Sequence, residues 1–436
     1  MEGLPSALSV AERARCQHLV YGVVRHAGRI EASLARLVAH SPRFITKAVL
    51  MLAGFELIEA TAAGAAPDCD TSSGSASSLP AKIIHHAVEQ AKGLSSPAEA
   101  RLVNAVARKL ETALREQRET GRLVPPESVA EYYSHPDWLV RRWFALYGAD
   151  STRELLRWNQ RPAPVFARVR ERGGQEGTAY VRGQEGTAYL PRGDSLCSGG
   201  DGLSSAFKPT SWVGFFEVVS GRWAEVEPLL KARAIYVQDP STRIAVDLLA
   251  PRPEETVLDL CAGPGGKSLL IADRMGKGKL VACDLPGQGM ERLRENLSAT
   301  SGVAVTLVEG DILREGPLLL RRRGLPEHYP AVLIDVPCSN TGVMRHRIDV
   351  KWRLRESDFR THGRQQLALL AAAASWVEPG GRLVYSTCSI DPEENEQVVE
   401  AFLKKAGAGF VLEERRLFFP WVEGHDGGGA FRLRRR

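Results

Sequence analysis

From Tyr236 onward, short apolar runs alternate with helical patterns, and this alternation constrains the fold more than any other feature. The runs that have the length and apolar character of buried strands are residues 256–260, 279–283, 304–308, 331–334 and 382–386. Alternating strands and helices are typical of a mostly parallel sheet with helices on both faces. The sequence therefore predicts a doubly wound, Rossmann-like α/β domain over residues 235–436.

The rest of the chain divides into two further segments. Apolar residues recur at helical spacing through residues 1–122, which predicts an all-α domain. Residues 62–79 within it are small, polar and rich in glycine and serine, so we interpret them as a surface insertion. We expect residues 123–234 to form a linker region of mixed α+β character that contacts RNA. It contains a tandem duplication over residues 174–189, to which we assign no function.

The composition is that of a globular protein, and it argues against disulfide-rich, secreted and membrane-spanning proteins. The 436 residues are 44% hydrophobic and 25% charged, and the net charge of +5 permits a polyanionic partner. The seven cysteines are scattered and lack zinc-ligand spacing, so we expect no metal ion and no disulfide scaffold. No signal peptide is visible, and the longest apolar stretch, residues 48–58, is too short to cross a bilayer. We expect a monomeric cytoplasmic protein without a membrane partner.

A glycine-rich loop, residues 261–267, follows the first predicted strand and precedes a helix. Its glycines let the backbone approach a ligand closely, and the helix offers free N–H groups. A phosphate-binding P-loop would need a glycine where Cys261 stands. Asp284 ends the next strand, where an acid can bind two ribose hydroxyls. Asp311 ends the third strand and is either placed to meet an adenine edge or is a helix N-cap.

Two cysteines follow the ends of two other predicted strands. Asp335 and Cys338 come after residues 331–334, and Cys388 comes after residues 382–386. In open α/β sheets ligands bind outside the carboxyl ends of the strands, so the two thiols can converge on one cleft. Alone, Cys338 would be read as an incidental buried cysteine in a turn. Two such thiols beside a nucleotide-type loop favour catalysis.

Together these motifs closely resemble the RNA cytosine-C5 methyltransferases of the NOL/NOP/Sun family, and the resemblance covers residues 236–436. Residues 11–25 and 102–108 resemble the NusB-like RNA-binding fold, which narrows the resemblance to the RsmB-type branch. That branch acts on small-subunit (16S) ribosomal RNA. The chain departs from the family at Gly289, where an arginine is usual nearby, and at Ile348, where a proline is common.

The resemblance implies a class I methyltransferase that uses S-adenosyl-L-methionine. A thiolate added to C6 of cytosine moves electron density to C5, which can then attack a methyl sulfonium. By resemblance Cys388 is the nucleophile, Cys338 assists product release, and Asp335 lies between cofactor and base. The residues that match the family's cofactor contacts are Cys261, Ala262, Gly263, Pro264, Gly265, Gly266, Lys267, Asp284, Asp311 and Asp335.

RNA contacts and the choice of RNA remain open. Arg345, Lys351 and Trp352 can hold the RNA backbone or the target base, or they can form a basic solvated loop. The terminal segment 434–436 reads as a frayed tail with weak phosphate attraction. One alternative keeps the chemistry but uses transfer RNA or another RNA. A second alternative is a non-catalytic RNA-binding ribosome assembly factor, against which the intact cysteine pair and glycine loop argue.

Overall fold

The computed structural model describes residues 5, 7–63, 78–120, 129–170, 205–298 and 300–436. The chain divides into two compact units. One comprises residues 1–161 with 347–353, and the other comprises residues 162–346 with 354–436. The duplication at 174–189 and most of the 62–79 insertion lie outside the described residues. The three-part division with boundaries near residues 122 and 234 stays a proposal.

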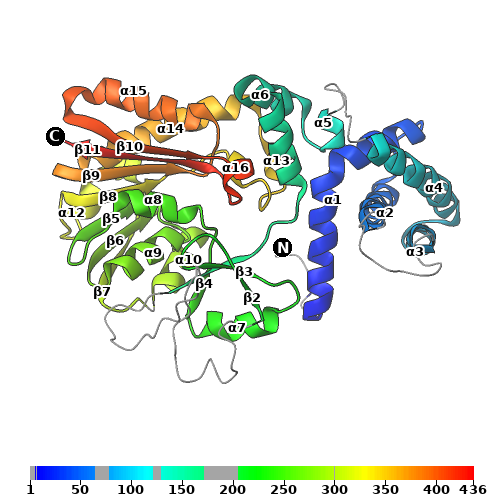
Figure 1. Ribbon diagram of the computed structural model, residues 1–436, viewed down its shortest axis with the longest axis horizontal. Helices are drawn as coiled ribbons and strands as arrows, with labels where there is room; N and C mark the ends of the chain where they lie inside the picture. The colour runs from blue at the N-terminus through cyan, green and yellow to red at the C-terminus, as the bar shows by residue number, and fades with distance from the viewer. Residues whose placement is uncertain (1–4, 6, 64–77, 121–128, 171–204, 299) are drawn as a thin grey trace. The chain divides into compact units, whose positions relative to one another are not determined.

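The first unit is helical, as predicted (Figure 1). Its helices are α1 (Val10–Leu37), α2 (Phe44–Ala63), α3 (Ser78–Leu94), α4 (Pro97–Thr120), α5 (Val129–Tyr132), α6 (Asp137–Gln160) and α13 (Val350–Arg353). Helix α1 begins with a capping box, in which the side chains of Ser9 and Glu12 bond each other's backbone N–H groups. Apolar side chains of α1 to α4, with Ile30, Leu50 and Leu110 fully buried, form the core.

The second unit contains a seven-stranded sheet in the order β10-β11-β9-β8-β5-β6-β7. Its strands are β5 (Thr256–Leu260), β6 (Gly278–Asp284), β7 (Val303–Glu309), β8 (Tyr329–Asp335), β9 (Val377–Thr387), β10 (Phe410–Phe418) and β11 (Gly428–Arg435). Strands β5 to β9 pair in parallel, and β11 runs antiparallel to both its neighbours. The five predicted strands and the Rossmann-like class are confirmed. The prediction of a frayed C-terminal tail is wrong, because Arg434 and Arg435 belong to strand β11.

Helices cover both faces of this sheet (Figure 1). One apolar core packs against α8 (Thr242–Leu249), α9 (Gly266–Met275) and α10 (Gln288–Leu297). The other packs against α11 (Ile312–Glu315), α12 (Leu318–Arg321), α14 (Glu356–Ser375) and α15 (Glu396–Ala406). The strands that lie between these layers are buried on both sides, so they read as continuous apolar runs.

A smaller antiparallel sheet precedes the large one, in the order β2-β3-β1-β4. It consists of β1 (Phe166–Val169), β2 (Phe207–Pro209), β3 (Phe215–Val218) and β4 (Ile235–Val237), with helix α7 (Trp223–Lys231). Arg168 and Arg170 form nearly buried ion pairs with Asp273 and so connect the smaller sheet to helix α9. Among the described residues, no helix is long and apolar enough to cross a membrane.

Candidate active site

The glycine loop lies between the carboxyl end of β5 and helix α9, and it packs against the end of β6. The N–H of Gly263 donates to the carboxylate of Asp284. A Cβ at Gly263 would lie 2.6 Å from that carboxylate. Gly265 has a φ of 103°, and a Cβ there would lie 2.9 Å from the side chain of Leu293. These positions need glycine because backbone and neighbours approach too closely for a side chain.

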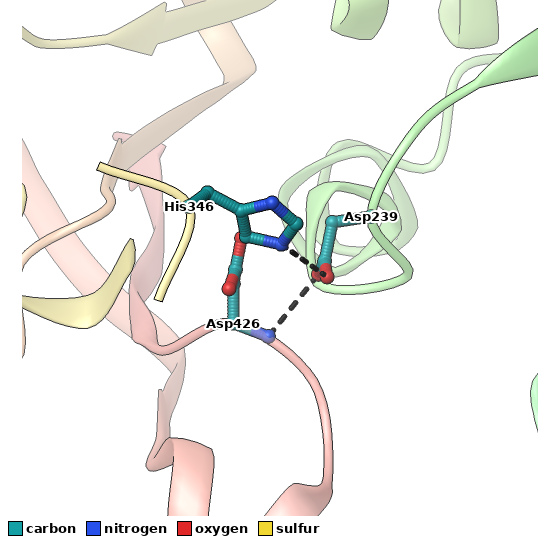
Figure 2. Close-up of side chains that lie close together, drawn as sticks. All are labelled: Asp239, His346 and Asp426. Atoms are coloured by element: carbon teal, nitrogen blue, oxygen red, sulfur yellow. Dashed lines mark hydrogen bonds and ion pairs between the residues drawn. The ribbon is translucent and has the colours of Figure 1, made fainter. Parts of the chain in front are cut away.

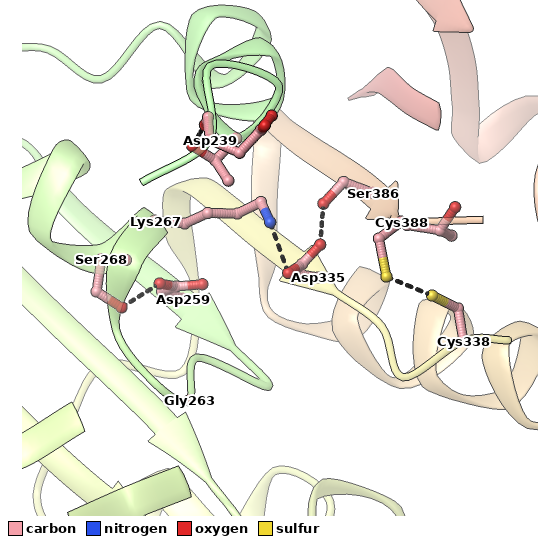
Figure 3. Close-up of polar contacts among 12 residues, drawn as sticks. Asp239, Asp259, Gly263, Lys267, Ser268, Asp335, Cys338, Ser386 and Cys388 are labelled. Carbon is pink, nitrogen blue, oxygen red and sulfur yellow. Dashed lines mark hydrogen bonds and ion pairs between the residues drawn. The ribbon is translucent and has the colours of Figure 1, made fainter. Parts of the chain in front are cut away.

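Lys267 and Asp335 bring the loop and strand β8 together (Figure 3). Lys267 Nζ lies 2.7 Å from Asp335 Oδ2, and Ser386 Oγ donates to Asp335 Oδ1 at 2.6 Å. Asp335 and Ser386 are register partners on β8 and β9, which places them side by side. Burial opposes the charge on Lys267, but the Asp335 carboxylate more than offsets it, so the pKa of Lys267 is raised. The contacts with Lys267 and Ser386 therefore hold this carboxylate in one orientation.

The two cysteines converge as the strand ends predict. Cys338 Sγ lies 2.9 Å from Cys388 Sγ (Figure 3). The hydrogen bond with Cys388, burial, and the negative charge of Glu394 raise the pKa of Cys338 well above its usual range. Cys338 therefore holds its proton at neutral pH, and Cys388 is the partner that can accept its S–H hydrogen bond. This asymmetry was not visible in the sequence.

A buried polar network fixes the loop that carries Cys338. The carboxylate of Glu394 accepts from Ser339 N at 2.9 Å, from Gln366 Nε2 at 3.0 Å and from Ser339 Oγ. Tyr385 Oη donates to the backbone carbonyl of Glu394 at 2.6 Å. Glu394 and Gln366 have no exposed surface. Because every partner is buried and bonded, this network holds the loop rigidly.

Comparisons with known proteins show the family of the chain. A family model described as 16S rRNA methyltransferase RsmB/F matches residues 246–416. Ribosomal RNA small subunit methyltransferase B of Erwinia tasmaniensis is 30% identical, over 97% of this chain and 91% of that protein. The probable ribosomal RNA small subunit methyltransferase B of Synechocystis is also 30% identical, over 91% of this chain and 82% of that protein. The chain belongs to the RsmB/F methyltransferase family.

Solved structures share the fold of this RsmB/F family member. The crystal structure of PH0851 has a TM-score of 0.69 at 22% identity, covering 98% of this chain and 91% of that chain. The structure of NSun6 from Pyrococcus horikoshii with SFG has a TM-score of 0.51 at 19% identity, covering 69% of this chain and 98% of that chain. At these identities the likeness supports the fold alone.

Asp311, a predicted cofactor contact, is the N-cap of α11. Its carboxylate accepts hydrogen bonds from the backbone N–H groups of Leu313 and Arg314.

Lys351, a predicted RNA contact, is 2% exposed, and its ammonium donates a hydrogen bond to the backbone carbonyl of Arg25 at 2.8 Å. Burial and the nearby Arg25 guanidinium lower the pKa of Lys351 well below its usual value. A direct RNA contact would require this ammonium to leave its carbonyl.

The other two predicted RNA contacts are also partly enclosed. Trp352 donates its indole N–H to the carbonyl of Val24 at 2.9 Å and keeps 37% of its surface exposed. Arg345 belongs to the other unit and is buried. The solvated-loop alternative is thus wrong for Lys351 and Arg345. A contact with RNA stays a prediction for Arg345, Lys351 and Trp352.

Three ionisable side chains that no sequence prediction grouped meet beside the helix α8 (Figure 2). His346 Nε2 lies 3.5 Å from Asp426 Oδ2 and 4.0 Å from Asp239 Oδ2. Asp239 Oδ1 accepts from the backbone N–H groups of Ser241 and Asp426 at 2.9 and 3.2 Å. Burial and the neighbouring Asp239 raise the pKa of Asp426 well above its usual range. His346, when protonated, offsets the repulsion between the two acids.

Proposed function

We propose that this RsmB/F family member transfers a methyl group from S-adenosyl-L-methionine to C5 of a cytosine in 16S ribosomal RNA. The observation that carries the proposal is the pair of Cys338 and Cys388, placed at two neighbouring strand ends and 2.9 Å apart. The anchored Asp335 lies at the end of the same strand β8. A methyltransferase that acted on an already nucleophilic atom would need no such thiol pair.

The cofactor fits the glycine loop by the chemistry of its surroundings. A Cβ at Gly263 would meet Asp284 and one at Gly265 would meet Leu293, so these glycines let the loop pack directly against Asp284, the acid that we propose for the ribose. We assign the cofactor to the loop 261–267, with Asp284 on the ribose hydroxyls, Asp311 near the adenine and Asp335 at the methyl-bearing end. S-adenosyl-L-methionine supplies an electrophilic methyl group on a sulfonium. Lys267 stays with Asp335 and keeps its carboxylate oriented.

The thiol pair performs the covalent steps. The Cys388 thiolate attacks C6 of the cytosine, a C–S bond forms, and the C5–C6 π electrons move to C5, which takes the methyl group. The C5 proton is then lost to a base, the C5–C6 double bond reforms, and the C–S electron pair returns to Cys388. Cys338, which keeps its proton, donates an S–H hydrogen bond to the departing thiolate. This hydrogen bond assists product release.

Asp335 is suited to hold the target base. Its two oxygens are fixed by Lys267 and Ser386, and further lone pairs remain for the exocyclic amino group of cytosine. The base must leave its stack or lie in a single-stranded loop to reach this position. The family and the named relatives support ribosomal RNA, and we propose that residues 1–122 are a NusB-like RNA-binding domain in a cytoplasmic enzyme.

One experiment tests the reaction and the RNA together. Purified protein is incubated with labelled S-adenosyl-L-methionine and either unmethylated 16S rRNA or transfer RNA, and 5-methylcytosine is mapped by sequencing. We expect one or a few sites in 16S rRNA. Labelling of transfer RNA alone would favour the alternative substrate. Binding of 16S rRNA with no transfer to any RNA would favour the assembly factor and refute the enzyme.

Variants of the two cysteines test their roles. Cys388→Ala should abolish transfer. Cys338→Ala should accumulate a protein–RNA complex that survives denaturation, because release of the Cys388 thiolate loses its hydrogen-bond donor. A stable complex in Cys388→Ala and none in Cys338→Ala would exchange the two assignments.

A further inference from the structure

Asn340 connects the two cysteines and takes no part in the covalent steps proposed above. Its side-chain Nδ2 donates to the backbone carbonyl of Cys338 at 2.9 Å. Its Oδ1 accepts from Cys388 Sγ at 3.3 Å. Cys388 is 48 positions further along the chain, directly after the end of the neighbouring strand β9. One amide therefore contacts both members of the thiol pair.

The local backbone explains why this amide points in one direction. Asn340 has a φ of 63° and a ψ of 26°, which is the left-handed region, just before the 3₁₀ turn at Thr341–Val343. Glycine and asparagine are the residues that tolerate this conformation best. A turn alone would be satisfied by either residue. Only asparagine adds an amide that reaches the sulfur of Cys388.

The side-chain amide of Asn340 has only one orientation that satisfies both contacts. Because a carbonyl accepts hydrogen bonds and cannot donate them, the contact with Cys338 requires Nδ2 on that side. Oδ1 is then left facing Cys388. The sulfur of Cys388 consequently has partners in two directions, Cys338 Sγ at 2.9 Å and Asn340 Oδ1 at 3.3 Å. These contacts hold the sulfur of the Cys388 thiol, whose S–H donates to Oδ1, in one position relative to the strand ends.

We propose that Asn340 is a positioning residue that holds the Cys388 thiol in place until it loses its proton and attacks the cytosine ring, and this inference rests on the proposed function. Attack requires the sulfur to lie about 3–3.5 Å from C6 in the correct direction, and a misplacement of about 1 Å can cost about 100-fold in rate. Asn340 acts through Cys388 and has no part in the cofactor contacts assigned above. Its loss should slow covalent addition and leave cofactor affinity unchanged.

Asn340→Gly is the appropriate variant because glycine keeps the left-handed backbone and removes only the amide. The matched control is Ala250→Gly, which replaces another left-handed residue (φ 47°) at the end of α8, outside the proposed site. RNA that carries 5-fluorocytosine at the target position serves as the probe, because fluorine cannot leave as a cation and the adduct therefore persists. The measurements are the rate of adduct formation, kcat, the KM for RNA, the cofactor Kd and thermal unfolding.

We expect Asn340→Gly to form the adduct about 10- to 100-fold more slowly, with KM, cofactor Kd and thermal unfolding unchanged within about twofold or a few degrees. Ala250→Gly should match the wild type. Asn340→Asp keeps the size of the side chain but loses the N–H donor to the Cys338 carbonyl. It should also form the adduct slowly. This second variant tests the positioning role even if Asn340→Gly folds poorly.

Two failures can be told apart. Wild-type adduct rates in both Asn340 variants, with Cys388→Ala unable to form the adduct, overturn the positioning role alone. Adduct formation by Cys388→Ala overturns the proposed nucleophile itself. A fall in cofactor affinity equal to the fall in rate would assign Asn340 to cofactor binding and would also overturn the inference.

Discussion

Asp259 should make the stability of the second unit, which contains the seven-stranded sheet, fall as pH rises. It lies in strand β5 with no exposed surface, and Ser268 Oγ donates to its Oδ2. Among the described residues its Oδ1 has no hydrogen-bond partner. Burial raises the pKa of Asp259 from 3.8 to about 7, although the Ser268 hydrogen bond opposes the rise. The folded protein therefore holds a proton that the unfolded chain has lost over most of this range.

The sign and size of the effect follow from linkage. A group whose folded pKa is raised contributes stability that is complete below the unfolded pKa and is lost as pH rises through the folded pKa. Each pKa unit corresponds to about 1.4 kcal/mol, so the full shift represents about 4 kcal/mol, of which about 3 kcal/mol is lost between pH 5 and pH 8. Asp259→Asn has the same shape and does not titrate.

The assay compares wild type with Asp259→Asn in urea titrations at pH 5, 6, 7 and 8. Hydrogen exchange of the β5 peptide, followed by mass spectrometry, reports unfolding of this strand specifically. The unfolding free energy of wild type should fall by about 3 kcal/mol relative to the variant between pH 5 and pH 8. Parallel pH profiles for the two proteins would refute the reasoning, because they would mean that Asp259 is ionised in both states across the range.

Three further substitutions test contacts described above. Lys267→Met removes the counter-charge of Asp335, and methyl transfer should fall by at least about 100-fold; activity within about threefold of wild type would contradict this role. Arg382→Met leaves the nearly buried Glu255 without its ion-pair partner, so urea unfolding should show a loss of about 3–5 kcal/mol, and a loss below about 1 kcal/mol would count against it. Trp352→Phe removes one hydrogen bond to a carbonyl of α1 and should lower the stability of the helical unit by about 1 kcal/mol, measured by urea unfolding; an unchanged midpoint would show that this bond contributes nothing.

The sequence predicted the central strands better than the last two. Strands β5 and β8 are buried on both faces, so their apolar residues are contiguous and easy to recognise. Strand β10 is half-exposed, and β11 begins with glycines and ends with arginines, which look like a loop and a tail. The structure explains the arginines, because Arg434 pairs with Glu413 of β10 across the strands.

The site was predictable to the extent that it depends on strand ends. Cys338 and Cys388 follow adjacent parallel strands, and the topology alone brings them to one edge of the sheet. Asn340 was not predictable, because its role depends on a left-handed backbone and one side-chain orientation, neither of which leaves a periodic signal. The burial of Lys351 was equally invisible, since a lysine beside a tryptophan looks the same whether its ammonium faces solvent or a helix carbonyl.

The charges around the two thiols provide an argument for their roles that does not depend on resemblance. The buried carboxylate of Glu394 faces Cys338 and disfavours a thiolate there. The positive Lys267 lies where it would attract a negative charge on Cys388, and this interaction contributes to the raised pKa of Lys267. The protonated Cys338 can act as the hydrogen-bond donor of the pair. These interactions support the proposed roles, in which Cys388 attacks the base and Cys338 assists release.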